Sequence, residues 1–541
     1  MSAAASTRFR ATHAIRERVR SGIDRRVHAD QVDHAAHVIF TNQNRTKLKE
    51  TPVSVNIPGF IDGNKKLLIG GQWVEPVGGE HIEAINPATG EVLCHIAKGG
   101  TQDVERAVAA ARRAFEGAWS RFTPHERRKL LLRVHDVILD HFDELALIET
   151  LDMGAPLART RGYKEWLSQL LQFYASQTGA GTVQAAPMSI APGFTALKHL
   201  MPVGVVGGII PWNGPLMGLW WIYGPALATG CTAVLKPAED ASLSSLRVSE
   251  LMMEAGVPDG VINVVTGYGK DVGQALAEHP DVDRVAFTGS VGTAQAIVRA
   301  SAGNLKRLQL ELGGKSPDIV FADADLDKAV PGAAMGVFTN TGQVCVAGTR
   351  IFVQRAIHDE FVQRIAAFAK TIRIGDGLAP DTQIGPLISQ RQLERVMHYV
   401  DIGGKEATLV HGGRRPGGEL ARGYFVEPTV FANVRNDMTI AREEIFGPVA
   451  SVIPFDTTEE ALQLANDTPY GLAGGVWTSS LSTAHKVSQG IRSGTVWVNC
   501  YGVIDPAVGF GGTKMSGYGW KGGKEHVESF LYPKATYINL G

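Results

Sequence analysis

The feature that most limits how this chain can fold is an alternation of short apolar strands with helices over residues 203 to 312. The strands are rich in Val, Ile and Leu, and the segments between them carry apolar residues at helical spacing, as in 242–255. We predict strands at 203–210, 232–236, 261–265, 284–288 and 306–312. Strands that alternate with helices form a parallel sheet with helices on both faces. The alternation therefore predicts an α/β fold with a doubly wound, dinucleotide-binding sheet.

A second alternating set of strands and helices begins at residue 317 and reaches about Trp497. Its first elements are predicted strands at 317–322 and 350–354 and predicted helices at 325–338 and 358–372. At 541 residues the chain is longer than one hydrophobic core usually serves. We therefore expect two or three domains, with the second set forming an α/β domain of its own.

The residues outside these two sets predict further elements. Apolar residues recur at helical spacing in 101–117, 124–151 and 163–178, which we interpret as helices. Residues 188–199 lack that period, and both this segment and 530–540 are expected to be extended. Residues 1 to about 60 are rich in arginine and poor in large hydrophobic residues. For them a disordered tail, an over-long start and, less favoured because of interrupting acidic residues, a targeting segment stay open.

Composition narrows the class of function. The net charge of −1 is spread without strong blocks, which disfavours nucleic acid and anionic membranes as partners and favours a small molecule. No apolar run is long enough to span a bilayer. The four cysteines lie far apart, without the spacing of a zinc site or a disulfide framework. We therefore expect no metal and a reducing, cytoplasmic location.

One cysteine lies in an unusual segment. Cys345 is placed in FTNTGQVCVAGTR, residues 338–350, among small and glycine residues rather than in a packed apolar run. Backbone N–H groups from Gln343 to Val346 are expected to gather beside an accessible thiol, where they lower its pKa or bind an oxyanion formed on its substrate. The segment predicts a nucleophile, although a lone cysteine is more often a small buried hydrophobic residue.

The segment around Cys345 resembles the active-site segment of the aldehyde dehydrogenase superfamily, FxNxGQxCxAxxR. Six further segments resemble motifs of that family, in its order and at close to its spacing. They are PWNGP (211–215), LKPAE (235–239), FTGS (287–290), LELGGKSP (310–317), EEIFGP (443–448) and GFGGTKMSGYG (509–519). The resemblance spans roughly residues 67 to 540, and seven ordered motifs make coincidence negligible, whereas any one of them is weak evidence.

The resemblance implies an aldehyde dehydrogenase-like fold with three parts. A Rossmann-type NAD-binding domain is expected over 61–187 and 203–313, and an α/β catalytic domain over 314–505. A small β oligomerisation element is expected over 188–202 and 506–541. In this family dimers and tetramers both occur, and the terminal β segment pairs with a neighbouring subunit, so a homodimer or homotetramer is expected.

The resemblance also implies which residues bind the cofactor. Lys236 and Glu239 match residues that bind the adenosine ribose. The acidic Glu239 favours NAD as the cofactor, although NADP stays possible. The alternative for these two residues is a surface charge pair. Ser290 opens a helix after Gly289, so the helix N–H groups suit a pyrophosphate, although an ordinary serine cap has the same sequence. Glu444 and Phe446 match residues that hold the nicotinamide ribose and ring. The remaining implied cofactor residues are Ile209, Pro211, Trp212, Phe287 and Gly269, the last in a loop equally explained as a turn.

The implied chemistry needs three side chains. Cys345 attacks the aldehyde to give a thiohemiacetal, which hydride transfer converts to a thioester. Asn213 joins the Cys345 backbone N–H in stabilising the oxyanion. Glu311 activates water to release the acid, and we expect its apolar neighbours to raise its pKa toward the range useful to a base. In isolation Asn213 would be interpreted as a turn residue and Glu311 as a carboxylate at a strand end.

The substrate is expected to approach Cys345 through an apolar tunnel. Gly214, Gly218, Trp221, Ile504 and Phe510 fall on positions that line it, with Met217 and Trp220 also in its walls and no charged residue among them. Two of these positions are glycines, where many relatives carry bulky residues, so we expect a bulky, branched or aromatic aldehyde. The alternative is that neighbouring side chains fill the space beside the glycines.

Two other functions stay open at this point. A relative that transfers the thioester to coenzyme A is disfavoured by Glu311, because a base that activates water favours hydrolysis. A structural or binding relative without catalysis is disfavoured because Cys345, Asn213, Glu311 and Glu444 are all present.

Overall fold

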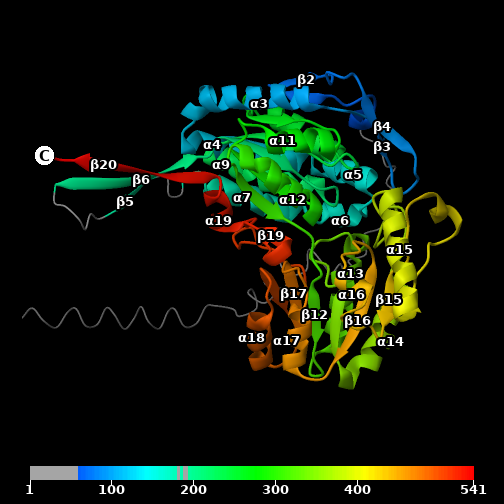
Figure 1. Ribbon diagram of the computed structural model, residues 1–541. Coiled ribbons are helices and arrows are strands. Elements are labelled where there is room, and N and C mark those ends of the chain that lie inside the picture. Colours follow the sequence, from blue (N-terminus) through cyan, green and yellow to red (C-terminus); the bar gives the residue numbers. More distant parts are fainter. Residues whose placement is uncertain (1–58, 180–182, 187–192) are drawn as a thin grey trace, which may run out of the picture. The chain divides into compact units, whose positions relative to one another are not determined.

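A computed structural model (Figure 1) describes residues 59–179, 183–186 and 193–541. Nearly all of the expected N-terminal extension, residues 1–58, and residues 188–192 of the expected extended segment lie outside the described residues. Within the described part, no helix combines the length and apolar character needed to cross a membrane. In the same residues, no group of three or more His, Cys, Asp or Glu side chains is arranged to hold a metal ion.

The first sheet has eight strands in the order β19-β11-β10-β7-β8-β9-β1-β2. Its strands are β1 (Leu67–Ile69), β2 (Gln72–Val74), β7 (Val205–Ile209), β8 (Thr232–Lys236), β9 (Ile262–Val264), β10 (Arg284–Thr288), β11 (Arg307–Glu311) and β19 (Gly517–Tyr518). The five central strands, β11 to β9 in this order, are parallel and are the five predicted from the sequence. β1, β2 and β19 add antiparallel pairs at the edges.

Helices cover both faces of this sheet. On one face, the side chains of Val205, Val234, Val285 and Phe287 pack with α3 (Thr101–Glu116), α11 (Gln274–Glu278) and α12 (Val291–Ala300). On the other face, their neighbours Val206, Ala233, Leu235 and Ala286 pack with α4, α5 and α7 to α10. The bounds are α4 Pro124–Asp140, α5 Phe142–Met153, α6 Leu157–Arg161, α7 Lys164–Ser176, α8 Pro215–Gly218, α9 Trp220–Thr229 and α10 Leu243–Glu254. The alternation of side chains along each strand thus builds one core on each face.

The predicted helix 124–151 is in fact two helices. α4 ends and α5 begins at His141, where φ is −98° and ψ is 10°. The backbone N–H of His141 donates to the carbonyl of Val137 (3.2 Å) and closes the last turn of α4. Apolar residues continue across the break, with Ile138 before it and Phe142 after it in the same core, so periodicity alone does not reveal it.

The second sheet has seven strands in the order β14-β15-β16-β13-β12-β17-β18, and all neighbours are parallel except β14 and β15. The strands are β12 (Pro317–Val320), β13 (Arg350–Gln354), β14 (Thr408–His411), β15 (Thr429–Ala432), β16 (Val449–Phe455), β17 (Ala473–Trp477) and β18 (Thr495–Val498). Its helices are α13 (Leu326–Phe338), α14 (His358–Thr371), α15 (Gln390–Glu406), α16 (Thr439–Arg442), α17 (Thr458–Asn466) and α18 (Leu481–Gly490). The predicted strands and helices of the second set are therefore confirmed to within a few residues.

The smallest sheet is an arm of three antiparallel strands, β20-β6-β5, which extends away from the helices of the first sheet (Figure 1). β5 is Val183–Ala186, β6 is Phe194–Pro202 and β20 is Leu531–Asn539. β20 pairs with β6 of the same chain along its whole length. A separate hairpin joins β3 (His81–Ile85) and β4 (Val92–Ala97), and α19 (Gly523–Glu528) precedes β20.

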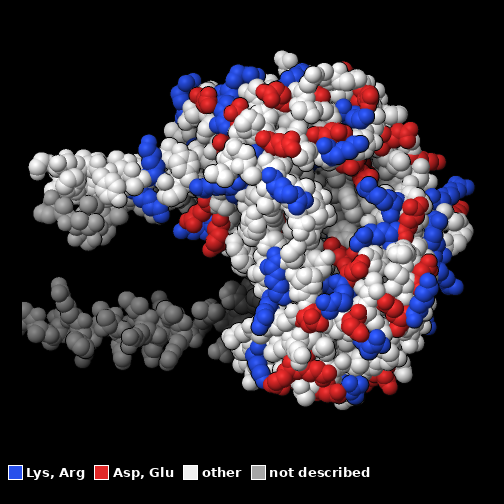
Figure 2. Space-filling view, viewed as in Figure 1, with Lys and Arg blue, Asp and Glu red and all other residues white. Residues whose placement is uncertain are grey.

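The charged side chains on the face shown in Figure 2 are mixed. Lys and Arg lie among Asp and Glu rather than in a patch of one sign. This face therefore offers no extended field of one sign to an anionic polymer or surface.

Candidate active site

Cys345 follows α13 by a short left-handed turn. α13 ends at Phe338, and Asn340, Thr341 and Gly342 then have φ angles of 53°, 57° and 72°. This conformation is uncommon for asparagine and strained for a β-branched threonine. At position 342 only glycine fits, because a β-carbon would overlap the carbonyl of Gly447. Backbone strain of this kind is retained where the surroundings hold a functional residue in place.

A chain of amide hydrogen bonds fixes Asn213 beside this turn. Arg159 of α6 donates to the side-chain oxygen of Asn340 (2.8 Å), and the Asn340 amide donates to the carbonyl of Asn213 (3.2 Å). The Nδ2 of Asn213 in turn donates to the carbonyl of Gln343 (2.9 Å). Arg159 lies outside every motif and carries no signal of this role in the sequence.

Two hydrogen-bond donors remain for an oxyanion beside Cys345. The Nδ2 of Asn213 carries two N–H groups, and Gln343 takes only one of them. The backbone N–H of Cys345 has no backbone acceptor among the described residues. Neutral donors held in a dry site stabilise developing negative charge without reorganising, so this geometry suits the predicted role of Asn213.

The thiol of Cys345 is harder to ionise than its sequence suggests. The residue is half-buried and packs in the same apolar cluster as Val346, Tyr501 and Phe510. Burial raises the pKa of the thiol to about 11, while the charge of Lys521 lowers that pKa and the charges of Glu444 and Glu311 raise it further. The backbone N–H of Cys345 does lower the pKa of the thiol, as expected, but desolvation outweighs it and the net pKa is raised.

Glu311 is the last residue of β11 and is 3% exposed. Neither carboxylate oxygen has a hydrogen-bond partner among the described residues. Burial raises the pKa of Glu311 to about 8, and the charge of Lys521 opposes the rise. The expected rise is thus confirmed. The segment after Glu311 reaches the nucleophile, because a β-carbon on Gly314 would lie 2.7 Å from the carbonyl oxygen of Cys345.

Glu444 and Phe446 lie on the other side of that segment. The carboxylate of Glu444 accepts a hydrogen bond from the backbone N–H of Gly314 (3.1 Å). Phe446 has a φ of 61°, and its ring lies edge-on to that of Trp212 at 5.3 Å between centroids. The structure therefore joins Glu444, one of the two residues predicted for the nicotinamide, to the loop that follows Glu311 and stacks the other, Phe446, edge-on against Trp212.

The other predicted cofactor residues lie at the carboxyl ends of the central strands. Lys236 ends β8, and its Nζ lies 2.8 Å from Glu239. Ser290 caps α12 and accepts a hydrogen bond from the backbone N–H of Thr293 (3.3 Å). A β-carbon on Gly292, in the first turn of α12, would meet nothing within 4 Å. Bare backbone at a helix N-terminus fits a pyrophosphate.

The remaining five predicted cofactor residues lie close to these strand ends. Ile209 ends β7 and Pro211 follows it, while the ring of Phe287 in β10 packs so close to Gly289 that a β-carbon would not fit there. Gly269 begins a five-residue π-helical turn, Gly269–Gly273, and borders open space. The carboxylate of Glu239 after β8 and the N-terminus of α12 after β10 are the kinds of group that fit NAD at the carboxyl ends of a parallel sheet.

Of the two glycines predicted at substrate positions, Gly214 borders open space and Gly218 has one neighbour. A β-carbon on Gly214 would meet nothing within 4 Å, and one on Gly218 would meet only Ile210, at 3.9 Å. Neighbouring side chains therefore do not fill the space beside Gly214. Trp220, expected in the wall, is instead fully buried against Tyr223.

The other predicted substrate residues pack with aromatic and apolar side chains. Trp221 lies edge-on to Trp166 of α7 at 5.5 Å, and the indole N–H of Trp166 donates to the carbonyl of Ile504 (2.8 Å). Ile504 and Phe510 pack in the same cluster as Cys345. Trp166 was not predicted, because an aromatic residue on a helix is most often part of the core.

A lysine outside the motifs lies next to the predicted wall residue Phe510. The backbone of Lys521 pairs with Phe510 in both directions, at 2.7 and 2.6 Å. Lys521 belongs to the segment after the last motif, so no pattern marked it.

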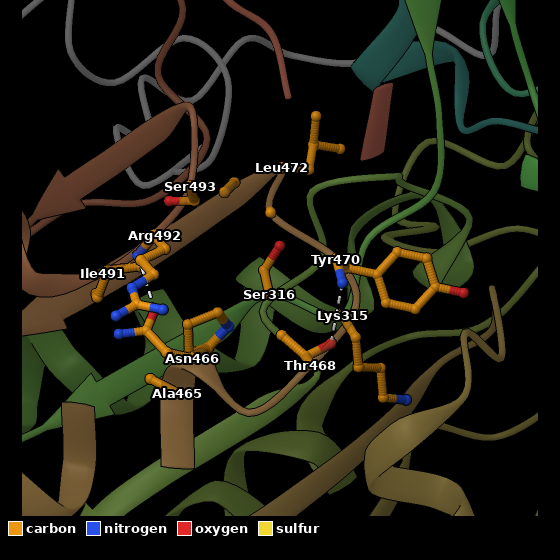
Figure 3. Close-up of a pocket in the computed structure, with 13 residues that line it drawn as sticks. Lys315, Ser316, Ala465, Asn466, Thr468, Tyr470, Leu472, Ile491, Arg492 and Ser493 are labelled. Carbon is orange, nitrogen blue, oxygen red and sulfur yellow. Dashed lines mark hydrogen bonds between the residues drawn. The ribbon is translucent and has the colours of Figure 1, made fainter. Parts of the chain in front are cut away.

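A small cavity behind Lys315 is too small for an aldehyde. Figure 3 shows it between the turn at Lys315 and Ser316 and the segment from Ala465 to Leu472. Its volume of about 10 Å³ is that of a single water molecule. Burial lowers the pKa of Lys315 to about 7, so this lysine adds little positive charge to the site above neutral pH.

Comparison with known proteins agrees with this geometry. The model of the aldehyde dehydrogenase family matches residues 73–536. Benzaldehyde dehydrogenase of Antirrhinum majus is 44% identical over 479 residues, covering 88% of this chain and 89% of that protein. An NAD+ complex of aldehyde dehydrogenase from Bacillus cereus is 43% identical, with a TM-score of 0.87, covering 89% of this chain and 98% of that one.

A third relative is named for a different aldehyde. The structure of betaine aldehyde dehydrogenase from Staphylococcus aureus with NAD+ is 40% identical, with a TM-score of 0.86, covering 88% of this chain and 95% of that one. The extent of these matches, together with the seven motifs, shows that the chain belongs to the aldehyde dehydrogenase family.

Proposed function

We propose that this aldehyde dehydrogenase oxidises its aldehyde with NAD+ to the free carboxylic acid, with Cys345 as nucleophile, Asn213 as oxyanion donor and Glu311 as base. The observation that carries the proposal is the arrangement around Cys345: its backbone N–H has no backbone acceptor among the described residues, Asn213 is bonded to the preceding Gln343 with a second N–H to spare, and the segment after Glu311 reaches Cys345. Each of these groups has a place in acyl transfer through a thioester.

Acylation begins when the sulfur of Cys345 attacks the carbonyl carbon. The thiol proton leaves to solvent, the S–C bond forms and the π electrons move to oxygen. The oxyanion accepts hydrogen bonds from Asn213 and from the N–H of Cys345, and losing one such donor costs about 3 kcal/mol of transition-state stabilisation. Bound NAD+ supplies the acceptor for the hydride that converts the thiohemiacetal to a thioester.

Deacylation uses Glu311 in its ionised form. The carboxylate accepts a proton from water, the water oxygen bonds to the thioester carbon and the C–S bond breaks with its electrons on sulfur. The proton on Glu311 then passes to the thiolate, which restores the carboxylate. The products are the carboxylic acid and the restored thiol. A pKa of about 8 for Glu311 makes it a stronger base than an ordinary carboxylate and leaves an appreciable ionised fraction near neutral pH.

An assay with a panel of aldehydes tests the proposal. We expect NADH and free acid in equal amounts, with no dependence on coenzyme A. An absolute requirement for coenzyme A would show an acylating enzyme instead. No NADH with any aldehyde would favour the non-catalytic alternative.

The ribose end supports NAD over NADP. Burial alone would raise the pKa of Glu239, but the charge and hydrogen bond of Lys236 outweigh it and the pKa is lowered, so Glu239 is ionised. A carboxylate there accepts hydrogen bonds from ribose hydroxyls and repels a 2′-phosphate. We expect Glu239→Gln to narrow the preference for NAD. Equal use of both cofactors by the unmodified enzyme would contradict this role.

The open space beside Gly214, the absence of a side chain at Gly218 and the Trp166–Trp221 pair support a bulky, branched or aromatic aldehyde. A relative that is 44% identical is named for benzaldehyde, which is an aromatic aldehyde. Another relative, 40% identical, is named for betaine aldehyde, so overall identity does not decide the substrate.

Gly218→Met tests this substrate class. We expect kcat/KM for aromatic aldehydes to fall relative to acetaldehyde, because a mismatch in an apolar pocket costs about 1 to 3 kcal/mol. Gly404→Ala, in the exposed part of α15, is the control, since a β-carbon there would meet nothing within 4 Å. A wild-type preference for acetaldehyde over every aromatic aldehyde would contradict the proposal.

A further inference from the structure

Lys521 extends from the segment that carries Phe510 to the carboxyl end of β10. Its Nζ donates to the hydroxyl of Thr288 (2.8 Å), the last residue of that strand. Thr288 is the register partner of Glu311 on the neighbouring strand β11. The ammonium is therefore held at the strand ends where Glu311 lies.

The backbone of Lys521 is fixed as firmly as its side chain. It exchanges two hydrogen bonds with Phe510, at 2.7 and 2.6 Å, and Phe510 packs in the same cluster as Cys345. Next to Phe510, a β-carbon on Gly511 would lie 3.2 Å from the Oε1 of Glu311. The two-stranded pairing of Phe510 with Lys521 thus places one cation beside both catalytic groups.

The charges that act on these groups do not have the same sign. Lys521 lowers the pKa of the Cys345 thiol, whereas Glu444 and Glu311 raise it. Lys521 is also the charged neighbour that acts on Glu311. His526 of α19 faces the same cation, but burial keeps its pKa well below the usual value, so it is neutral and adds no charge.

We propose that Lys521 is a positioning residue for both half-reactions, holding a fixed positive charge that favours the thiolate of Cys345 and the carboxylate of Glu311. The proposal rests on the proposed function for its catalytic meaning, but the ionisation of the thiol is measurable without turnover. In a site that burial makes unfavourable to anions, one cation of this kind shifts an ionisation midpoint by about one pH unit.

The test is the pH dependence of alkylation of Cys345 by iodoacetamide in the full chain without cofactor or aldehyde. Alkylation is followed on the peptide that contains Cys345, which separates it from the half-buried Cys500. Removing a cation disfavours the thiolate, so we expect Lys521→Met to move the midpoint up by about one pH unit and to slow alkylation about tenfold at any pH below it. Lys521→Arg keeps the charge and is expected to keep the wild-type midpoint.

Lys524→Met is the matched control, since this neighbouring lysine has a side chain 62% exposed and pairs with Glu528. An unchanged midpoint in Lys521→Met, or an equal shift in Lys521→Arg or in Lys524→Met, would overturn the proposal. If Lys521→Met does not fold, Lys521→Arg together with Lys521→Gln decides by the same comparison.

The second readout separates this proposal from the proposed function. In Lys521→Met we expect the midpoint for deacylation, set by Glu311, to move up as well. A shift in alkylation without any aldehyde oxidation by the wild type would contradict the proposed function and leave the electrostatic role of Lys521 standing. Normal aldehyde oxidation by the wild type without a shift in alkylation in Lys521→Met would contradict the role of Lys521 and leave the proposed function standing.

Discussion

At the scale of single residues, burial raises the pKa of both groups that we propose for the chemistry, which helps the base and hinders the nucleophile. It raises the pKa of Glu311 to about 8, where a carboxylate is a useful base, and it raises the pKa of Cys345 to about 11, where a thiol is mostly protonated. The base gains from an apolar site, whereas the nucleophile needs hydrogen-bond donors and a cation to offset the rise in its pKa.

Glu311→Gln tests the base. The amide cannot accept a proton from water, so we expect a burst of about one NADH per subunit followed by a much slower steady state. In the wild type, deacylation should rise about tenfold per pH unit below a midpoint near 8, because only the ionised carboxylate acts. Stopped-flow absorbance measures both. A burst and steady state that fall by the same factor would show that Glu311 acts before deacylation.

The motifs supplied the proposed catalytic residues but not their surroundings. Cys345, Asn213 and Glu311 each lie in a motif, and the apolar neighbours of Glu311 in the sequence foretold its raised pKa. The sign of the shift at Cys345 was missed because the groups that desolvate it come from distant segments, such as Tyr501 and Phe510. Such contacts leave no local pattern.

At the scale of elements, the turn between α13 and Cys345 concentrates backbone strain. Asn340, Thr341 and Gly342 are left-handed in succession. The side-chain amide of Asn340 holds the turn by donating to the carbonyls of Asn213 and Gln343. A loss of this turn would move the nucleophile relative to its oxyanion donors.

Gly342→Ala tests the turn. A β-carbon would overlap the carbonyl of Gly447 and would also sit in a left-handed conformation, so we expect a loss of about 2 to 4 kcal/mol of stability and of most activity. Gly404→Ala is the matched control, and in its open helical position it should add up to about 1 kcal/mol. Denaturant titration of both variants measures the difference. Equal stability of the two would contradict the account of the turn.

The regular elements were largely predictable, whereas their breaks and edges were not. Strands β8, β10 and β13 match their predicted bounds, because buried parallel strands are continuous apolar runs. The break at His141 was missed because apolar periodicity runs through it. The antiparallel edge strand β19 was also missed, because two residues are too few to show a period.

At the scale of the whole molecule, the arm β20-β6-β5 and the residues that end it expose apolar side chains to solvent. Tyr537 is 67% exposed and Leu540 is 68% exposed. Exposed apolar groups gathered on one projecting element mark an interaction surface, which supports the expected homodimer or homotetramer.

Removing residues 532–541 tests the arm. The fully buried Phe530 is left in place, so the fold should survive while β6 loses its partner strand. We expect a smaller native mass by light scattering than that of the full chain. Leu481→Ser, which removes a 74% exposed apolar residue elsewhere, should leave the mass unchanged. An unchanged mass after the truncation would contradict a role for β20 in assembly.

The measurement that tests the central claim most directly is trapping of the covalent intermediate. Glu311→Gln is mixed with NAD+ and benzaldehyde, and the intact protein and its peptides are weighed by mass spectrometry. The account predicts one benzoyl group per subunit, on the peptide that contains Cys345, and no adduct in a Glu311→Gln, Cys345→Ala double variant. NADH formation without an adduct, or an adduct on any other residue, would contradict it.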